Sequence, residues 1–124
     1  MFFLLGLWSQ KGKPKGLVNG RLAECPDSPN AVSSEPGTQP EKVVKPLQAG
    51  LEEVMAAIKK TGGVITSHRD DYLSATYMSS VFKFVDDVEV RTDGAVCHIR
   101  SASRVGYSDR GANRKRVAAI RAAL

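Results

Sequence analysis

Cysteine and histidine are scarce in this chain, which has only two of each among its 124 residues. Neither Cys25 nor Cys97 belongs to a C-x-x-C pair or to a Cys/His cluster with the spacing of zinc ligands. The sequence therefore predicts no metal site, and we expect no cofactor. The two thiols either pair in an exported protein or stay separate in a cytosolic one. We expect them to be unbonded, because Cys25 falls in a surface arm and Cys97 in a strand that faces the core.

Long apolar runs are also lacking. The apolar stretch Met1–Trp8 is far shorter than the roughly 20 residues that span a bilayer, and its basic cluster follows it, unlike that of a secretory signal. Three interpretations remain, in this order: a remnant or mis-started signal anchor, a membrane-surface anchor, or a segment that packs on the domain. We expect the cell envelope or periplasm as the location, with the cytoplasm as the alternative.

Acidic residues are scarce at the C-terminal end. The net charge is +5, and residues 100–124 hold seven arginines and lysines against one acid, Asp109. This asymmetry predicts an anionic partner, namely a small anionic ligand, an acidic lipid headgroup or an acidic protein segment. Nucleic acid ranks third, because Tyr107 is the only aromatic residue among these basic residues. A solvated helix face is the plainer interpretation of Lys115 and Arg121.

Large apolar side chains are also sparse between the N-terminal run and residue 46, where prolines, glycines, serines and lysines are frequent. A chain of this length suits one core. We therefore expect residues 1–15 to be a separate N-terminal segment and residues 16–124 to form one domain. Within it, residues 16–45 are predicted as an extended arm over a core made by residues 46–124.

Periodicity in the second part of the chain predicts two helices and four strands. Helical spacing indicates one helix over residues 46–60 and another over residues 109–124, with Asp109 as N-cap and Leu124 among the inward residues. Alternating patterns indicate four strands, over residues 64–69, 72–77, 81–91 and 95–103. The predicted fold class is α+β, with a four-stranded antiparallel sheet and both helices packed on one of its faces.

The turn between the last two strands predicts their register, because Asp93-Gly94 suits a two-residue type I′ turn. Cross-strand partners then follow from the alternation of side chains. The predicted pairs are Val88 with Ile99 and Asp86 with Ser101 on the core side, and Glu89 with His98 and Asp87 with Arg100 on the other side.

Three segments carry most of the distinctive residues: CPDSPNAVSS (25–34), FVDDVEV (84–90) and RSASRVGYSDRGANRKR (100–116). In order and spacing they resemble the bacterial and plastid family DUF1499, whose function is unknown, over roughly residues 16–124. The resemblance implies a fold and an envelope or organelle setting for many members, and it implies no reaction.

The first segment departs from the family pattern, which usually has a second cysteine where this chain has Ala31. A thiol pair within this segment is therefore excluded. The segment has no histidine at the offset of a nucleophile motif, and its composition suits a rigid, hydrogen-bonded turn that docks on the domain. The residues assigned to this turn are Cys25, Pro26, Ser28, Pro29, Asn30 and Ser33.

Asp86 is the most unusual position, because strand alternation places its carboxylate on the core side, where an unpaired charge is costly. Arg104 is the predicted partner, through a bidentate link that ties the sheet to the following loop. A structural clamp is favoured over a catalytic acid for Asp86, since ion-pair networks occupy carboxylates without chemistry. Asp87 is the second carboxylate considered for either role.

The third segment predicts an anion-binding site, because a loop enters the last helix where free N–H groups and the helix dipole meet several arginines. The candidate ligand-binding residues are Arg100, Ser101, Ser103, Arg104, Tyr107, Ser108, Asp109, Arg110, Asn113 and Arg114. The alternative is that these residues bond internally, with Asn113 and Tyr107 holding the arm.

Two functions follow from these patterns. The first is a non-enzymatic binding or interaction module of the envelope that holds an anion with residues 100–116. The second is a hydrolase or transferase that uses Asp86 or Asp87 with the serines and arginines of the same loop. An open cleft that exposes Asp86 favours chemistry, whereas mutual hydrogen bonding favours a clamp.

Overall fold

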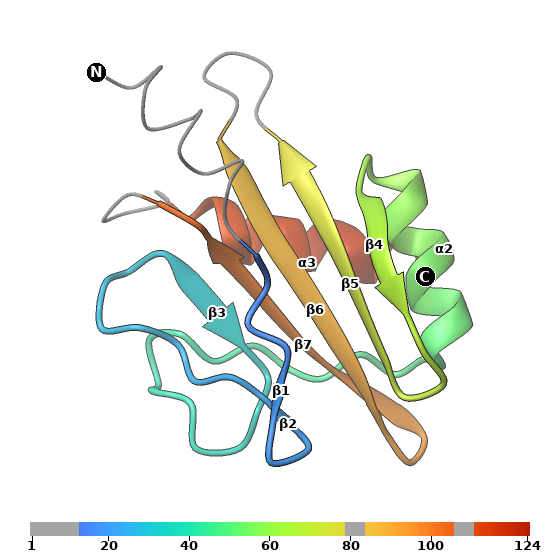
Figure 1. The fold of residues 1–124 in the computed structure, drawn as a ribbon, viewed down its shortest axis with the longest axis horizontal. Helices are drawn as coiled ribbons and strands as arrows, with labels where there is room; N and C mark the ends of the chain where they lie inside the picture. The colour runs from blue at the N-terminus through green and yellow to red at the C-terminus, as the bar shows by residue number, and fades with distance from the viewer. Residues whose placement is uncertain (1–12, 79–83, 106–110) are drawn as a thin grey trace.

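The computed structural model describes residues 13–78, 84–105 and 111–124 (Figure 1). The N-terminal apolar run therefore lies outside the described residues. The fold class is α+β, as predicted, and no helix in the described ranges is long and apolar enough to cross a membrane. The elements are β1 (Leu17–Val18), β2 (Arg21–Leu22), β3 (Ala31–Ser33), α2 (Leu51–Lys60), β4 (Val64–His68), β5 (Tyr72–Met78), β6 (Val85–Asp93), β7 (Val96–Ser103) and α3 (Ala112–Ala122).

The main sheet has five antiparallel strands in the order β3-β7-β6-β5-β4, one more than the four predicted. The additional strand is β3, which pairs with residues 100–102 of β7. Its three residues are too few to show an alternating pattern, and they lie in the proline-rich arm. The sequence pattern therefore gave no sign of this strand.

A separate two-stranded sheet, β1 with β2, lies in front of the main sheet in Figure 1. Asn19 and Gly20 connect the two strands with φ of 54° and 77°. Two successive left-handed residues are what a type I′ turn requires, and Asn-Gly is its strongest sequence signal. The prediction of an arm without strands overlooked that signal.

The β6–β7 hairpin keeps the predicted faces but not the predicted register. Gly94 and Ala95 are the two central turn residues, and Gly94 has φ of 62°, in the glycine position of a type II′ turn. The predicted pairing of Val88 with Ile99 is wrong, since Val88 pairs with Ser101. A shift by two residues leaves each side chain on its face, because side chains alternate with period two. The other pairs change likewise, to Asp86 with Ser103, Asp87 with Ala102 and Glu89 with Arg100.

The first helix begins later than predicted. α2 starts at Leu51, with Gly50 as its N-cap, whereas the expected start was Pro46. Leu47 does not join the helix, because its N–H and C=O both bond to Cys97, each at 2.9 Å. Leu47 is nevertheless fully buried. Its place in the apolar spacing therefore indicated that it is buried, and not that it belongs to the helix.

The last helix, α3, also begins later than predicted, at Ala112 with Gly111 in the N-cap position. The predicted N-cap, Asp109, lies outside the described residues. Val117 and Ile120 are buried, but Leu124 is 44% exposed, so its predicted inward position is wrong.

The main sheet has two dissimilar faces. The helix face packs against α2 and α3, which both lie behind the sheet in Figure 1, in one apolar core. Val54 and Ile58 of α2 and Val117 and Ile120 of α3 meet the strands there. The strand residues in this core include Leu73, Ala75, Val88, Val90, Cys97 and Ile99.

The opposite face, here called the arm face, is covered in part by β2, which contacts β6 and β7. Its buried side chains are largely polar or charged, and they include Tyr72, Asp87, Glu89, His98 and Arg100. Cys25 of the arm is buried on this side, in a small cluster with Ala31 and Ala102. Cys97 lies on the helix face and both thiols are free, which confirms the prediction that they are not bonded to each other.

Candidate functional site

Asp86 lies on the helix face with a cationic partner, but the partner is not Arg104. Its Oδ2 accepts a hydrogen bond of 2.6 Å from Arg116 of α3. Arg116 also bonds to Asn113 and stacks its guanidinium over the Tyr77 ring, 4.6 Å from the centroid. The predicted pair of Asp86 with Arg104 is therefore wrong, because Arg104 follows the end of β7 on the arm side while α3 covers the other face.

Arg104 binds the neighbouring carboxylate, Asp87, on the arm face. The link is bidentate, with Nε donating to Oδ2 at 2.8 Å and Nη2 donating to Oδ1 at 2.9 Å. Arg104 therefore forms the bidentate link that was predicted, but with Asp87 and not with Asp86. Both carboxylates considered for catalysis hold arginines.

Glu89 and Arg100 form a third pair, the most deeply buried of the three, with residue exposures of 0% and 4%. Glu89 Oε2 accepts hydrogen bonds from the Tyr72 hydroxyl at 2.6 Å and from the Gly16 N–H at 2.7 Å. Burial and the Glu89 carboxylate both raise the pKa of Tyr72, so its hydroxyl remains a donor. The arm is therefore joined to β5 and β6 through one carboxylate.

The Glu35 carboxylate binds Arg91, Arg21 and the backbone of Leu22, and no sequence pattern predicted this role. Its carboxylate accepts two hydrogen bonds from Arg91, at 2.5 and 2.9 Å, and one from the Leu22 N–H at 2.8 Å. Burial raises the pKa of Glu35, but these hydrogen bonds and one from Arg21 outweigh it and hold the pKa at about 2. The available signal was the Pro-Gly pair directly after Glu35, which predicts a turn but not the contacts of the Glu35 side chain.

Asn113 is fully buried, and its side-chain amide forms hydrogen bonds with several residues of other segments. Its amide donates to the Asn30 carbonyl and to Ser103 Oγ, each at 3.0 Å, and its carbonyl accepts from Ser101 Oγ at 2.6 Å. Three predicted ligand-binding residues are thus bonded to one another and to the first segment. These contacts match the internal alternative, in which Asn113 holds the arm.

Other residues of the predicted turn also have structural contacts. Ser28 Oγ donates to Asn30 Oδ1 at 3.1 Å, and Ser33 Oγ accepts from the Glu35 N–H at 3.1 Å. The Pro26 carbonyl accepts a hydrogen bond from the buried Lys42 ammonium. Burial raises the pKa of the Cys25 thiol, more strongly than the nearby Arg100 and Lys42 charges lower it.

Four of the predicted anion-binding residues, Tyr107, Ser108, Asp109 and Arg110, lie outside the described residues. Of the others, Arg100 and Arg104 are held in the ion pairs above. Among the predicted arginines that the structure describes, only Arg114 faces outward and has no described carboxylate within ion-pair distance.

A serine, a histidine and an aspartate also meet on the arm side. His98 Nδ1 lies 3.0 Å from Ser34 Oγ, and Nε2 lies 3.1 Å from Asp93 Oδ2. However, Nδ1 is also 3.1 Å from the Ser34 carbonyl oxygen. This oxygen can only accept a hydrogen bond, so the contact forms only if Nδ1 carries a proton. Ser34 Oγ in turn accepts a hydrogen bond of 2.8 Å from the Ile99 N–H, in the place of a backbone carbonyl of a neighbouring strand. This arrangement anchors the end of β3 to β7.

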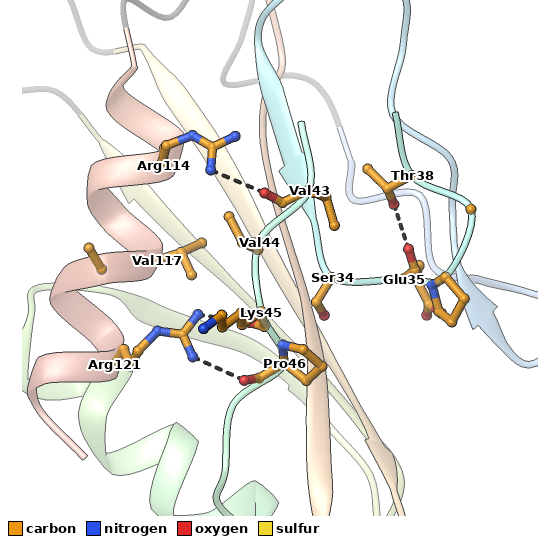
Figure 2. A pocket seen from close by; sticks show the side chains of 13 residues that line it. Ser34, Glu35, Thr38, Val43, Val44, Lys45, Pro46, Arg114, Val117 and Arg121 are labelled. Atoms are coloured by element: carbon orange, nitrogen blue, oxygen red, sulfur yellow. Dashed lines mark hydrogen bonds between the residues drawn. The ribbon is translucent and has the colours of Figure 1, made fainter. Parts of the chain in front are cut away.

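A groove of about 640 Å³ lies between α3 and the chain segment that leads from β3 to α2 (Figure 2). Its lining is Ser34, Glu35, Pro36, Gly37, Thr38, Val43, Val44, Lys45, Pro46, Arg114, Val117, Ala118 and Arg121. Arg114 also lines a smaller hollow of about 250 Å³, beside Gly111 and Lys42. A third hollow, of about 750 Å³, lies between the β1–β2 hairpin and residues 35–39. Asp86 and Asp87 line none of these three hollows.

Two arginines cross the groove to the facing segment, as Figure 2 shows. Arg114 donates to the carbonyls of Val43 and Glu41, at 3.1 and 2.9 Å. Arg121 donates to the carbonyls of Pro46 and Lys45, at 3.0 and 2.7 Å. No described carboxylate lies within ion-pair distance of Arg114, Arg121 or Lys45. None of these three charges is neutralised by a described carboxylate, and the carbonyl bonds hold the two arginines in position.

The described ranges contain no group of three or more His, Cys, Asp or Glu side chains that could hold a metal ion. In the comparisons with curated proteins and with solved structures, nothing matches this chain. A family model described as a protein of unknown function, DUF1499, matches residues 21–124. The match covers most of the sequence and includes all three distinctive segments, and the chain belongs to the DUF1499 family.

Proposed function

We propose that this protein is a non-enzymatic interaction module that binds an anionic partner in the groove beside α3. The observation that carries the proposal is the contrast between two sets of arginines. Arg91, Arg100, Arg104 and Arg116 each hold a carboxylate. Arg114 and Arg121 hold only carbonyls, so their positive charges remain available to a ligand.

The groove offers a ligand both charge and apolar contact. Arg114, Arg121 and Lys45 stand at its walls, and Val43, Val44 and Val117 lie between them. The two guanidinium groups are already oriented by their carbonyl bonds, so a ligand does not have to order them. The hydrolase or transferase alternative lacks a comparable observation, because Asp86 and Asp87 are occupied by arginines and line none of the three hollows.

Binding of fluorescently labelled polyglutamate, followed by anisotropy at about 50 mM salt, tests the proposal. We expect the double variant Arg114→Gln/Arg121→Gln to bind at least tenfold more weakly than the parent. Lys59→Gln/Lys60→Gln is the matched control, because it removes two charges from exposed positions of α2, and its affinity should stay within twofold.

A third variant separates charge from structure. Lys45 makes no side-chain hydrogen bond within the described residues, so Lys45→Glu reverses a groove charge without removing a carbonyl bond. It should weaken binding at an unchanged unfolding midpoint. Equal affinity of the parent, the groove variants and the control would refute the proposal.

The sequence Met1–Trp8 with its following lysines supports a further part of the proposal, attachment of the module to an anionic membrane surface in the cell envelope. Sedimentation of the full chain with vesicles that contain about 30% anionic lipid tests it. Leu4→Ser/Trp8→Ser should reduce the bound fraction, and retention of full binding by this variant would contradict membrane attachment through the N-terminus.

A further inference from the structure

We infer that the partner of the groove is an extended peptide with two acidic side chains three positions apart and aliphatic residues between them. This inference rests on the proposed function and specifies its ligand. Its basis is the spacing of the fixed charges, the apolar surface between them and the concave shape of the site.

The two arginines define the spacing. Arg114 and Arg121 are seven residues apart on α3, which is close to two full turns, so they lie on the same side of the helix about 10 Å apart along its axis. A single phosphate or carboxylate is too small to bridge that distance. A ligand that uses both guanidinium groups needs two separate anionic groups.

An extended backbone supplies two such groups at only a few spacings. In a β-strand, side chains on one side recur every second residue, about 7 Å apart. In a polyproline II helix they recur every third residue, about 9 Å apart. The second spacing matches the arginines more closely, which favours acids at positions i and i+3 of a polyproline II segment.

The surface between the arginines is apolar. Val117 and Val44 lie between them in Figure 2, and Val43, 42% exposed, is among the most exposed large apolar residues of the described chain. Aliphatic or proline residues between the two acids would cover this surface, and proline also favours the polyproline II backbone. A flat bilayer surface would not follow the concave wall between α3 and the facing segment.

The two ends of the groove differ in charge. Lys45 adds a second positive charge beside Arg121. At the other end, Arg114 donates to the carbonyl of Glu41, so an exposed acidic residue lies close to that arginine. The acid at the Arg121 end should therefore contribute more to affinity. Removal of Arg121 should accordingly weaken binding more than removal of Arg114.

Two labelled peptides of identical composition test the spacing. One contains Glu-Pro-Leu-Glu and the other Glu-Glu-Pro-Leu, each flanked by Gly-Ser repeats. We expect the parent protein to bind the first at least fivefold more tightly, and Arg121→Gln to abolish the preference. Lys59→Gln, on the exposed surface of α2, should retain it. Equal affinities for the two peptides would overturn the inference.

Further outcomes distinguish this inference from the proposed function. If the peptides bind equally while polyglutamate still depends on Arg114 and Arg121, the spacing is wrong and the anion-binding groove stands. If neither peptide nor polyglutamate binds, both fail. Competition by about 1 mM inorganic phosphate, or vesicle binding that requires the two arginines, would replace the peptide with a small anion or a lipid headgroup and so overturn the inference.

Discussion

The two faces of the main sheet are buried by different means, and the difference shows how the arm is positioned. On the helix face, Val88, Val90 and Ile99 meet apolar residues of both helices. Apolar burial is strongly stabilising but non-directional. On the arm face, ion pairs and hydrogen bonds fix particular atoms to one another. The helix face therefore supplies most of the cohesion, and the arm face specifies where the arm lies.

The arm face gains little net stability from its charges but is sensitive to the loss of one. Desolvation offsets most of the attraction within a buried ion pair, so its replacement by apolar residues is often neutral. Removal of one partner leaves an uncompensated buried charge and costs about 3–5 kcal/mol. Single and paired substitutions therefore test whether the two faces differ as described.

The largest expected effect is that of Glu89→Ala. This change leaves Arg100 buried without its carboxylate and removes the acceptor of Tyr72 and Gly16. We expect the free energy of unfolding to fall by about 3–5 kcal/mol, measured by urea titration. Ile99→Val, one methyl group smaller on the helix face, should cost about 0.5–1.5 kcal/mol.

The double variant Glu89→Met/Arg100→Met removes both charges and keeps much of the volume. It should be more stable than Glu89→Ala alone, because no unpaired ion remains. A double variant less stable than the single one would show that the pair itself, and not the orphaned charge, supplies the stability.

Glu35 gives the next effect, which depends on pH. Its pKa of about 2 lies below the ordinary value of 4.5, so the folded state favours the ionised form. The resulting stability is intact above about pH 4.5 and is lost as the pH falls toward 2, by on the order of 2–3 kcal/mol. Urea midpoints between pH 5 and pH 2.5 should fall more steeply for the parent than for Glu35→Gln. If the urea midpoints of the parent and of Glu35→Gln fell in parallel with pH, ionised Glu35 would not be a stabilising contact of the arm.

The elements that the sequence predicted correctly are those whose pattern repeats. β5, β6 and β7 are long enough to alternate, and Val117 and Ile120 mark the inner side of α3. The predicted face of each residue in β6 and β7 is correct although the predicted register is wrong, because the error was two residues and side chains alternate with a period of two. The short β3 and the start of α2 depend on pairing with β7, which no local pattern encodes.

The candidate site was predicted less well, for a related reason. The sequence indicated that Asp86 needs a cation, but the choice among arginines depends on which helix covers which face. The groove is also invisible in the sequence, since its walls come from α3 and from residues 34–46, brought together by the fold. Among the described residues of the predicted site, only Arg114 also lines the groove.

Asp86 and Asp87 offer the sharpest comparison of the two faces, because adjacent residues place one carboxylate on each. Asp87 holds Arg104 by two hydrogen bonds, whereas Asp86 accepts one from Arg116, whose side chain is 20% exposed. Arg116 would keep Asn113 and the Tyr77 ring as contacts after the loss of Asp86. The charge left behind is thus partly solvated and partly stabilised by the ring.

The smallest effect is therefore expected for Asp86→Ala, a loss of about 1.5 kcal/mol, which is typical of one hydrogen bond to a charged group. A urea titration at neutral pH measures it, and Asp70→Ala, an exposed carboxylate in the β4–β5 turn, is the control that should change by less than about 0.5 kcal/mol. A loss of 3 kcal/mol or more would mean that an unpaired arginine costs as much on the helix face as on the arm face. The partial exposure of Arg116 would then not lower that cost. A loss no greater than that of the control would show that Arg116 does not need the carboxylate, and would make the Asp86 side chain available for another role.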